Sequence, residues 1–347
     1  MKKNELILSV RDLNIKFNLR GKILHAIRGI DLDVYHGEVL AIVGESGSGK
    51  SVFTKSFMGL LDSNGSITSG TIDYFGADDH QPIRLSDLKK EKDWLKVRGH
   101  EIAMIMQDPM TSLNPLKTIG DQIMEAVELH QGLKGAAARE KTLEYLRDVG
   151  IADPEVRFKQ YPHEFSGGMR QRVVIAIAVA CNPQILICDE PTTALDVTIQ
   201  AQIMNLLRSL KRELRMSLLL ITHDMGLVAQ MADRVMVMYA GQIIEEGTVF
   251  EIFDHPSHPY TKALLAAVPS MEQNPEKMLQ AIEGTVPENY GQMTGCRFRD
   301  RCPYRKQGCE APQELEEIKA EETQKAQELH RVRCWRAKEA EQSGRTL

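Results

Sequence analysis

A glycine-rich turn that begins at residue 44 constrains the fold of this chain more than any other feature of its sequence. An apolar run of strand length, 38–43, precedes the turn, and apolar residues at helical spacing, 52–61, follow it. The turn has the G-x-x-x-x-G-K-S pattern of a phosphate-binding P-loop, and it reads Gly44-Glu45-Ser46-Gly47-Ser48-Gly49-Lys50-Ser51, followed by Val52. Glycines let backbone N–H groups approach phosphate oxygens, and the helix N-terminus adds its positive dipole end. The pattern therefore predicts a strand–loop–helix unit that binds a nucleoside triphosphate.

Two side chains of this P-loop have defined chemical tasks. Lys50 is expected to reach the β- and γ-phosphates of ATP, and the Ser51 hydroxyl is expected to bind Mg²⁺. A glycine-rich turn with an accidental Lys-Ser pair is the structural alternative, and the flanking strand and helix patterns argue against it.

Length and charge narrow the class of protein. The 347 residues suffice for one large or two ordinary domains, and 42% hydrophobic with 26% charged residues are typical of a globular chain. The net charge of −5 argues against a nucleic-acid binder with a dominant basic field. The longest apolar run, 173–181, is shorter than the roughly 18 residues that cross a bilayer. We therefore expect a cytoplasmic protein that acts at a membrane only through a partner.

The N-terminal segment 6–34 alternates apolar and polar residues, which predicts antiparallel strands joined by a turn at 20–22. Phe17 lies at the end of one of these strands. It is either a core aromatic residue or a platform on which a nucleotide base stacks.

The region after the P-loop helix continues as an α/β pattern. A predicted strand, 101–106, leads to Gln107, and the turn-rich segment 108–115 is expected to form no regular element. Helical spacing over 119–150 indicates a helical subdomain inserted into the core. Ser166, Gly167 and Gly168 then precede a buried helix. They form either a plain N-cap or a second anion-binding helix N-terminus.

Two further apolar strands end in polar side chains. Residues 185–188 lead to Asp189 and Glu190, and two adjacent acids are costly inside a core unless they have a task. In a P-loop ATPase the first acid holds Mg²⁺ and the second polarises water; the alternative is a strand that simply reaches solvent. Residues 217–222 lead to His223, which we expect on the same side of the sheet, where it would sense phosphate.

Four of the six cysteines lie in a polar C-terminal tail. Cys296, Cys302, Cys309 and Cys334 have the spacing C-x5-C-x6-C-x24-C, which matches neither a common zinc finger nor a ferredoxin. Spacing alone predicts a metal site, with zinc ahead of iron, and the alternative is four unrelated surface thiols. The other two cysteines, Cys181 and Cys188, lie in apolar runs and are expected in the core.

The order of these features resembles the nucleotide-binding subunit of an ABC transporter over about residues 6–250. The resemblance implies an α/β P-loop NTPase with a RecA-like core, an antiparallel β subdomain and a helical subdomain, over 1–250, and a cysteine-containing extension over 251–347. In the family pattern Phe17 stacks adenine, Gln107 is the Q-loop glutamine and His223 is the switch histidine. Ser166-Gly167-Gly168 corresponds to the signature motif, and Asp189-Glu190 to the Walker B pair.

Four segments are similar to the oligopeptide/dipeptide importers within that superfamily, namely 107–115, 161–169, 189–197 and 255–265. This similarity implies an ATPase that powers peptide import from the cytoplasmic face of the cell membrane. The partners it implies are a second ABC ATPase subunit in a heterodimer, two membrane permeases and an extracytoplasmic peptide-binding protein, with no nucleic acid. It also implies that the four tail cysteines carry a [4Fe–4S] cluster.

The resemblance assigns roles in ATP hydrolysis as well. Ser51, Gln107 and Asp189 would hold Mg²⁺ and the attacking water, and Glu190 would orient or deprotonate that water. His223 would contact the γ-phosphate, whereas the Ser166 helix would serve the nucleotide of the partner subunit. Two alternatives stay open: an importer of another solute such as nickel, and an ABC-type ATPase that acts on nucleic acid with the cysteines as a zinc module.

Overall fold

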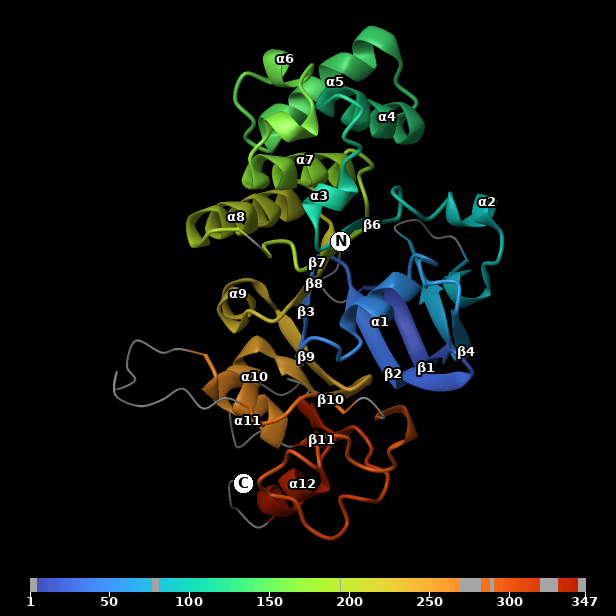
Figure 1. Ribbon diagram of the computed structural model, residues 1–347, viewed down its shortest axis with the longest axis vertical. Helices are drawn as coiled ribbons and strands as arrows, with labels where there is room; N and C mark the ends of the chain where they lie inside the picture. The colour runs from blue at the N-terminus through green and yellow to red at the C-terminus, as the bar shows by residue number, and fades with distance from the viewer. Residues whose placement is uncertain are drawn as a thin grey trace.

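The structure is a computed structural model that describes residues 5–76, 81–193, 195–268, 282–287, 290–318 and 330–342. Figure 1 shows three regions along the long axis of the molecule. A helical region lies at one end, the two sheets lie in the middle, and the C-terminal residues form the opposite end. This arrangement confirms the predicted α/β core with an antiparallel β subdomain and a helical subdomain.

The main sheet is built on parallel strands, as the buried apolar runs predict. Its order is β11-β12-β10-β9-β3-β8-β7-β6, and the pairs β3–β8, β3–β9, β7–β8 and β6–β7 are parallel. Every residue of the central strand β3 is buried. The strands are β3 (Val39–Val43), β6 (Ile102–Ile105), β7 (Ile185–Asp189), β8 (Ser217–Thr222), β9 (Arg234–Tyr239), β10 (Gln242–Thr248), β11 (Glu316–Ile318) and β12 (His330–Val332).

The second sheet is antiparallel and has the order β2-β1-β4-β5. A two-residue turn joins β1 to β2, with φ of +51° at Arg20 and +84° at Gly21. Positive φ at both positions matches the right-handed twist of a hairpin, so the predicted turn is confirmed. The strands are β1 (Leu6–Leu19), β2 (Lys22–Tyr35), β4 (Gly65–Tyr74) and β5 (Ile83–Arg84).

Helices cover the main sheet and form the helical region. In that region the 119–150 pattern becomes two helices, α4 and α5, which pack with α7 around apolar residues such as Ile123 and Leu146. The α-helices are α1 (Lys50–Ser56), α2 (Glu91–Trp94), α3 (Pro109–Ser112), α4 (Ile119–Gln131), α5 (Gly135–Asp148), α6 (Pro154–Arg157), α7 (Gly167–Val179), α8 (Val197–Leu214), α9 (Met225–Met231), α10 (Val249–Asp254), α11 (Pro259–Ala266) and α12 (Trp335–Gln342). Single 3₁₀ turns are η1 (Leu85–Asp87), η2 (Pro162–Glu164) and η3 (Tyr290–Gln292).

One prediction about the segment that follows β6 was wrong. The segment 108–115 was expected to have no regular element, but 109–112 forms the short helix α3. Proline is well suited to the first position of a helix because its missing N–H would have no intrahelical partner there. The hydroxyls of Thr111 and Ser112 donate to the Asp108 carbonyl oxygen at 3.1 and 2.9 Å, which stabilises the turn.

The C-terminal residues complete the main sheet. Strand β12 pairs antiparallel with β10, and β11 pairs with β12. Glu245, which pairs with Val332 in this contact, is fully buried and accepts hydrogen bonds from the Ser257 and His258 amides at 2.6 and 2.9 Å. His330 of β12 lies 2.8 Å from the same carboxylate. The extension is therefore joined to the core by paired backbone and by a buried polar cluster.

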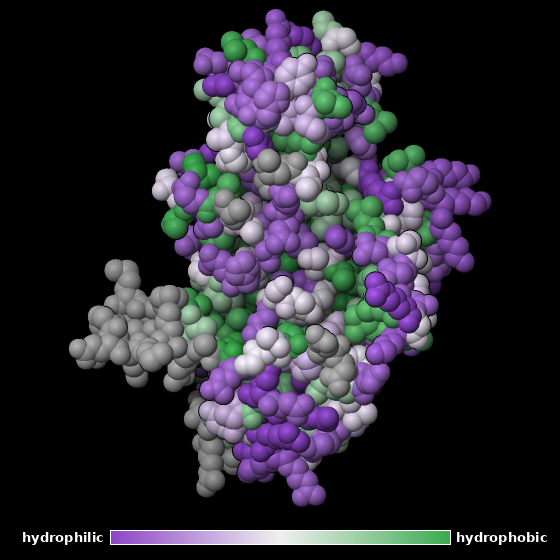
Figure 2. Space-filling model, viewed as in Figure 1, coloured by the Kyte–Doolittle hydropathy of each residue, from purple (hydrophilic) through white to green (hydrophobic). Residues whose placement is uncertain are grey.

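The surface is hydrophilic over much of the helical end and the C-terminal end, and hydrophobic residues gather between them on the face that Figure 2 shows. Within the described ranges, we find no helix whose length and apolar character would suit a bilayer crossing.

Candidate functional site

The P-loop joins β3 to α1, as predicted, and two of its glycines make its curvature possible. Gly44 has a φ of +151°, and a Cβ at this position would lie 2.1 Å from the Met238 carbonyl oxygen. Gly49 precedes α1 with a φ of +102°. Both conformations are accessible to glycine and strained for other residues, so the sequence pattern and the loop geometry agree.

Lys50 is buried at the start of α1, and its ammonium points back to the loop. Its Nζ donates to the carbonyl oxygens of Gly44 at 2.7 Å and Glu45 at 3.0 Å. Burial lowers the pKa of Lys50, and the carboxylates of Glu190 and Asp189 oppose that change. A buried ammonium beside neutral carbonyl oxygens has the chemistry to bind an anionic phosphate.

Asp189 ends β7 beside the P-loop and has the chemistry of a Mg²⁺ ligand. Its carboxylate is buried and accepts a hydrogen bond from the Ser51 hydroxyl, whereas its Oδ1 atom has no hydrogen-bond partner among the described residues. Burial raises the pKa of Asp189, and the Ser51 hydrogen bond opposes the rise. A buried carboxylate oxygen without a partner is costly, and hard cations bind such oxygens. Asp189 and Ser51 therefore fit a Mg²⁺ ion.

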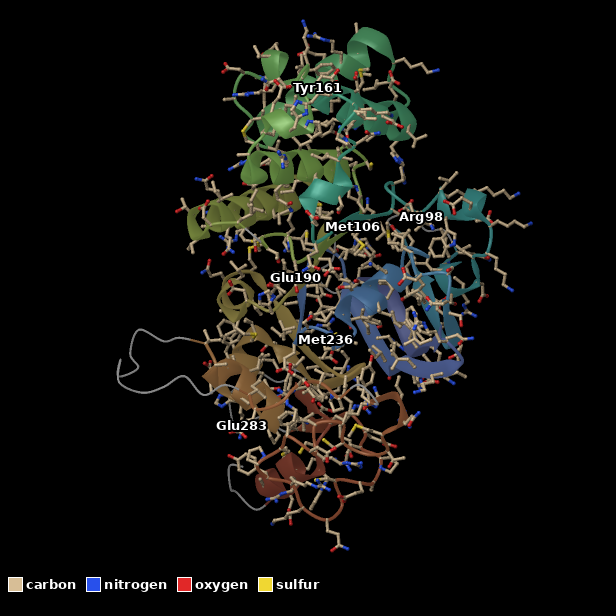
Figure 3. All side chains as sticks on the ribbon, in the orientation of Figure 1. Arg98, Met106, Tyr161, Glu190, Met236 and Glu283 are labelled. Carbon is tan, nitrogen blue, oxygen red and sulfur yellow. The ribbon has the colours of Figure 1, made fainter. Side chains whose placement is uncertain are left out.

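Glu190 lies among three hydrogen-bonding side chains at the end of β7. Gln107 Nε2 is 3.1 Å and Thr193 Oγ1 is 2.9 Å from its Oε2 atom, and His223 Nδ1 is 3.3 Å from its Oε1 atom. The backbone of Glu190 has a φ of +49°, a strained conformation for a residue other than glycine. Figure 3 shows Glu190 near the middle of the molecule, away from Tyr161 in the helical region. The structure thus brings together Gln107, Glu190 and His223, which the sequence assigns to one site.

An open cavity lies beside the P-loop and matches much of the predicted nucleotide site. The aromatic ring of Phe17 forms one part of its wall, and Tyr290 from the C-terminal extension forms another. Sequence patterns did not indicate Tyr290, because it belongs to no motif and lies far from the P-loop in the chain. The lining residues are Phe17, Leu19, Leu24, Ala26, Ser46, Gly47, Gly49, Lys50, Ser51, Val52, Asp62, Gln107, Glu190 and Tyr290.

Ser166, Gly167 and Gly168 are separate from this cavity. Ser166 is exposed at the N-terminus of α7, where its Oγ accepts from the Met169 amide at 3.3 Å. Gly168 packs tightly on α8, because a Cβ there would lie 2.7 Å from Ile199 Cγ2. The structure therefore does not bring the serine–glycine motif to the P-loop of its own chain.

The four tail cysteines line one closely packed cavity in the extension. Its wall also contains three buried N–H donors without a hydrogen-bond partner in the described part of the chain. These donors are Arg299 Nε, Trp335 Nε1 and Arg336 Nε. Cys181 and Cys188 lie elsewhere, buried in the core as predicted.

Burial changes the acidity of three thiols in the cysteine cavity. Burial raises the pKa of Cys296 to about 12, and it also raises the pKa values of Cys302 and Cys334. A neutral buried thiol is a poor nucleophile, so a role as reactive free thiols is disfavoured. Over the residues that the structure describes, no group of three or more His, Cys, Asp or Glu side chains is arranged to hold a single metal ion.

Comparison with known proteins decides the family. The profile of the ABC transporter family matches residues 27–193, and that of the oligopeptide/dipeptide transporter C-terminal region matches residues 244–309. The chain is 53% identical to the oligopeptide transport ATP-binding protein AmiE of Streptococcus pneumoniae, over 87% of this chain and 83% of that protein. This chain belongs to the ATP-binding subunits of oligopeptide/dipeptide ABC transporters. The resemblance inferred from its motifs is confirmed.

Other relatives agree with this assignment. The dipeptide transport ATP-binding protein DppD of Bacillus subtilis is 49% identical over 95% of each chain. Among solved structures, the ATP-binding cassette MJ0796, in a dimeric post-hydrolysis state with ADP and phosphate, has a TM-score of 0.61 and 26% identity. The match covers 70% of this ABC ATPase and 99% of the MJ0796 chain. The predicted fold and the predicted ATPase activity are therefore confirmed.

Proposed function

We propose that this chain is the ATPase subunit that powers the import of di- or oligopeptides from the cytoplasmic face of the cell membrane. The observation that carries the proposal is continuous similarity, through the cassette and the extension, to proteins named for peptide transport. None of the named relatives is described as acting on nucleic acid or nickel, so we favour neither alternative. We also retain as a proposal the division into a cassette over 1–250 and an extension over 251–347.

The site residues support hydrolysis by positioning and charge stabilisation, which phosphoryl transfer chiefly needs. Lys50 would bind the β- and γ-phosphates, and Phe17 would stack on the adenine ring. Mg²⁺, held by Ser51 and Asp189 with Gln107 nearby, would neutralise phosphate charge. Glu190 would accept a proton from the attacking water. The contacts of its carboxylate with Gln107 and His223 support this role, because Gln107 would orient that water and His223 would contact the γ-phosphate.

The exposed Ser166 supports a composite site shared by two subunits. It lies at an α-helix N-terminus that is separate from its own nucleotide cavity, so it is available to the nucleotide of a facing subunit. The similar cassette MJ0796 is described as dimeric. We propose a heterodimer with a second ABC ATPase, mounted on two permeases and supplied by an extracytoplasmic peptide-binding protein.

We further propose that Cys296, Cys302, Cys309 and Cys334 hold a [4Fe–4S] cluster. Their shared cavity supports this, and so do the three buried N–H donors around it, because such donors stabilise cluster sulfurs. The cluster would serve structure or regulation, since the cysteines line a cavity distinct from that of the nucleotide. Anaerobically purified chain should contain about four irons and four acid-labile sulfides, and Cys302→Ser should lose them. Stoichiometric zinc without sulfide would contradict the cluster.

The hydrolysis proposal is tested with Glu190→Gln, which preserves the size of the side chain and removes its basicity. We expect ATP binding to persist and turnover to fall by about 10²- to 10⁴-fold. Near-normal hydrolysis by this variant, assembled with its partner subunit, would overturn the role of Glu190.

The transport proposal is tested in proteoliposomes that contain the complete complex and its binding protein. Uptake of a labelled peptide should require ATP and stop with Glu190→Gln. ATP-dependent uptake of nickel, with no uptake of peptide, would favour the other importer class.

A further inference from the structure

The C-terminal extension reaches the nucleotide site at the first variable residue of the P-loop. Arg301 Nη1 lies 2.6 Å from Glu45 Oε2, and Arg301 Nη2 lies 2.9 Å from Glu45 Oε1. Two parallel N–H···O bonds between a guanidinium and a carboxylate fix direction as well as distance. The Arg301 side chain is only 7% exposed, so solvent screens this pair less than a surface ion pair.

Arg301 is itself held firmly by its surroundings. Its Nε donates to the Glu283 carbonyl oxygen at 2.8 Å, and its Nη1 is 3.2 Å from the Tyr239 hydroxyl. The guanidinium also lies 5.8 Å from the centre of the Phe298 ring, which packs against the ring of Tyr239. A side chain fixed at several points can impose its position on the residue that it binds.

Glu45 links Arg301 to the phosphate-binding groups of the P-loop. Its amide donates to the Tyr260 hydroxyl at 2.8 Å, and its carbonyl oxygen accepts from Lys50 Nζ at 3.0 Å and from the Ser48 amide at 3.2 Å. One residue therefore contacts the extension through its carboxylate and its amide, and the catalytic lysine through its carbonyl oxygen. Movement of the Glu45 side chain would displace the carbonyl that orients Lys50.

We propose that Arg301 is a positioning residue for the P-loop, supplied by the C-terminal extension, and that it acts through Glu45 to set nucleotide affinity. It does not touch the cavity that receives the nucleotide. The inference rests on the nucleotide site proposed above and adds to it a control point outside the cassette motifs. A peptide-transport cassette without this extension would bind nucleotide with a less ordered loop.

The test measures the Kd for ADP by calorimetry on the full-length chain, with Arg301→Gln, Glu45→Gln and the double variant. We expect each single variant to raise the Kd about tenfold, and the double variant to equal the singles, because the two residues act as one unit. At saturating ATP, kcat should change little while KM rises. Arg305→Gln is the matched control, since Arg305 lies in the same loop, is half exposed and pairs with Asp300 and Glu310.

The outcomes distinguish failure of the role proposed for Arg301 from failure of the nucleotide site itself. A wild-type Kd for ADP in folded Arg301→Gln, or effects that add in the double variant, would overturn the role of Arg301. If Arg301→Gln does not fold, Glu45→Gln removes the negative charge and one of the two acceptors of the same pair from the P-loop side, and an unchanged Kd there overturns the role of Arg301 equally. Failure of the wild-type chain to bind ADP would instead overturn the nucleotide site.

Discussion

Replacing Gly65 with alanine should weaken nucleotide binding although Gly65 does not line the nucleotide cavity. Gly65 in β4 pairs with Phe17 in β1. A Cβ at this position would lie 2.5 Å from Phe17 Cε1 and 2.8 Å from Cζ. Carbon atoms are in favourable contact at about 3.5–4.0 Å, so the ring must move by about 1 Å. The ring that we assign to the adenine would then leave its position.

The size of the effect follows from stacking energies. Stacking of a base on an aromatic ring contributes about 1–3 kcal/mol, which corresponds to roughly a 5- to 150-fold change in Kd. Because Gly65→Ala shifts the ring and does not remove it, we expect about a fivefold increase in the Kd for ADP. Phe17→Ala should give a larger increase, since it removes the platform.

Calorimetry with two ligands makes the experiment specific. At the proposed site ADP would contact both the Phe17 ring and the P-loop, whereas tripolyphosphate has no base to stack. Gly65→Ala should therefore weaken ADP and leave tripolyphosphate unchanged. Ser66→Ala, an exposed position in the same strand, is the control and should change neither. Unchanged ADP affinity in folded Gly65→Ala would refute the assignment of Phe17 to the adenine.

Three other expectations concern charge, the cavity wall and the core. Burial raises the pKa of Glu38 to about 7 and outweighs the attraction of Arg234 at 3.3 Å. Because the pKa of Glu38 is higher in the folded state than in the unfolded state, protonation of Glu38 stabilises the fold. That stabilisation is complete below about pH 4.5 and is lost as the pH rises to 7. Glu38→Gln should therefore reduce the fall in unfolding free energy between pH 5 and 8, by up to about 3 kcal/mol; parallel denaturation profiles would count against this. Tyr290→Ala should raise the Kd for ADP about threefold to tenfold by opening the cavity wall, whereas Tyr290→Phe should leave it unchanged. Equal ADP affinities for the wild type and both variants would exclude Tyr290 from nucleotide binding. Leu146→Ala, at a fully buried position in α5, should cost about 2–5 kcal/mol of stability in urea denaturation and leave the ADP Kd unchanged.

The sequence predicts those parts of the site that depend on contiguous residues. The P-loop and the acids after β7 follow from local patterns, because a strand end fixes where the next side chains lie. Gln107 and His223 come from different strands, yet parallel strands place their carboxyl ends at one edge of the sheet. The convergence of these residues on Glu190 could therefore be expected before the structure was known.

Contacts between distant segments were not predictable in the same way. Arg301 meets Glu45 across 256 positions, and Tyr290 belongs to no motif. Strands β11 and β12 have three residues each, which is too short for an alternating pattern to be recognised. Their place beside β10 depends on tertiary packing, and so does the burial of His330 against Glu245.

The pairing of β12 with β10 has a consequence for the order of events during synthesis. Strand β10 is translated about 80 residues before β12, which at ribosomal rates is an interval on the order of ten seconds. During that interval the edge of β10 has unpaired backbone groups, and such edges invite pairing with another chain. Nascent chains that accumulate before residue 330 are therefore exposed to misassembly in a way that finished chains are not.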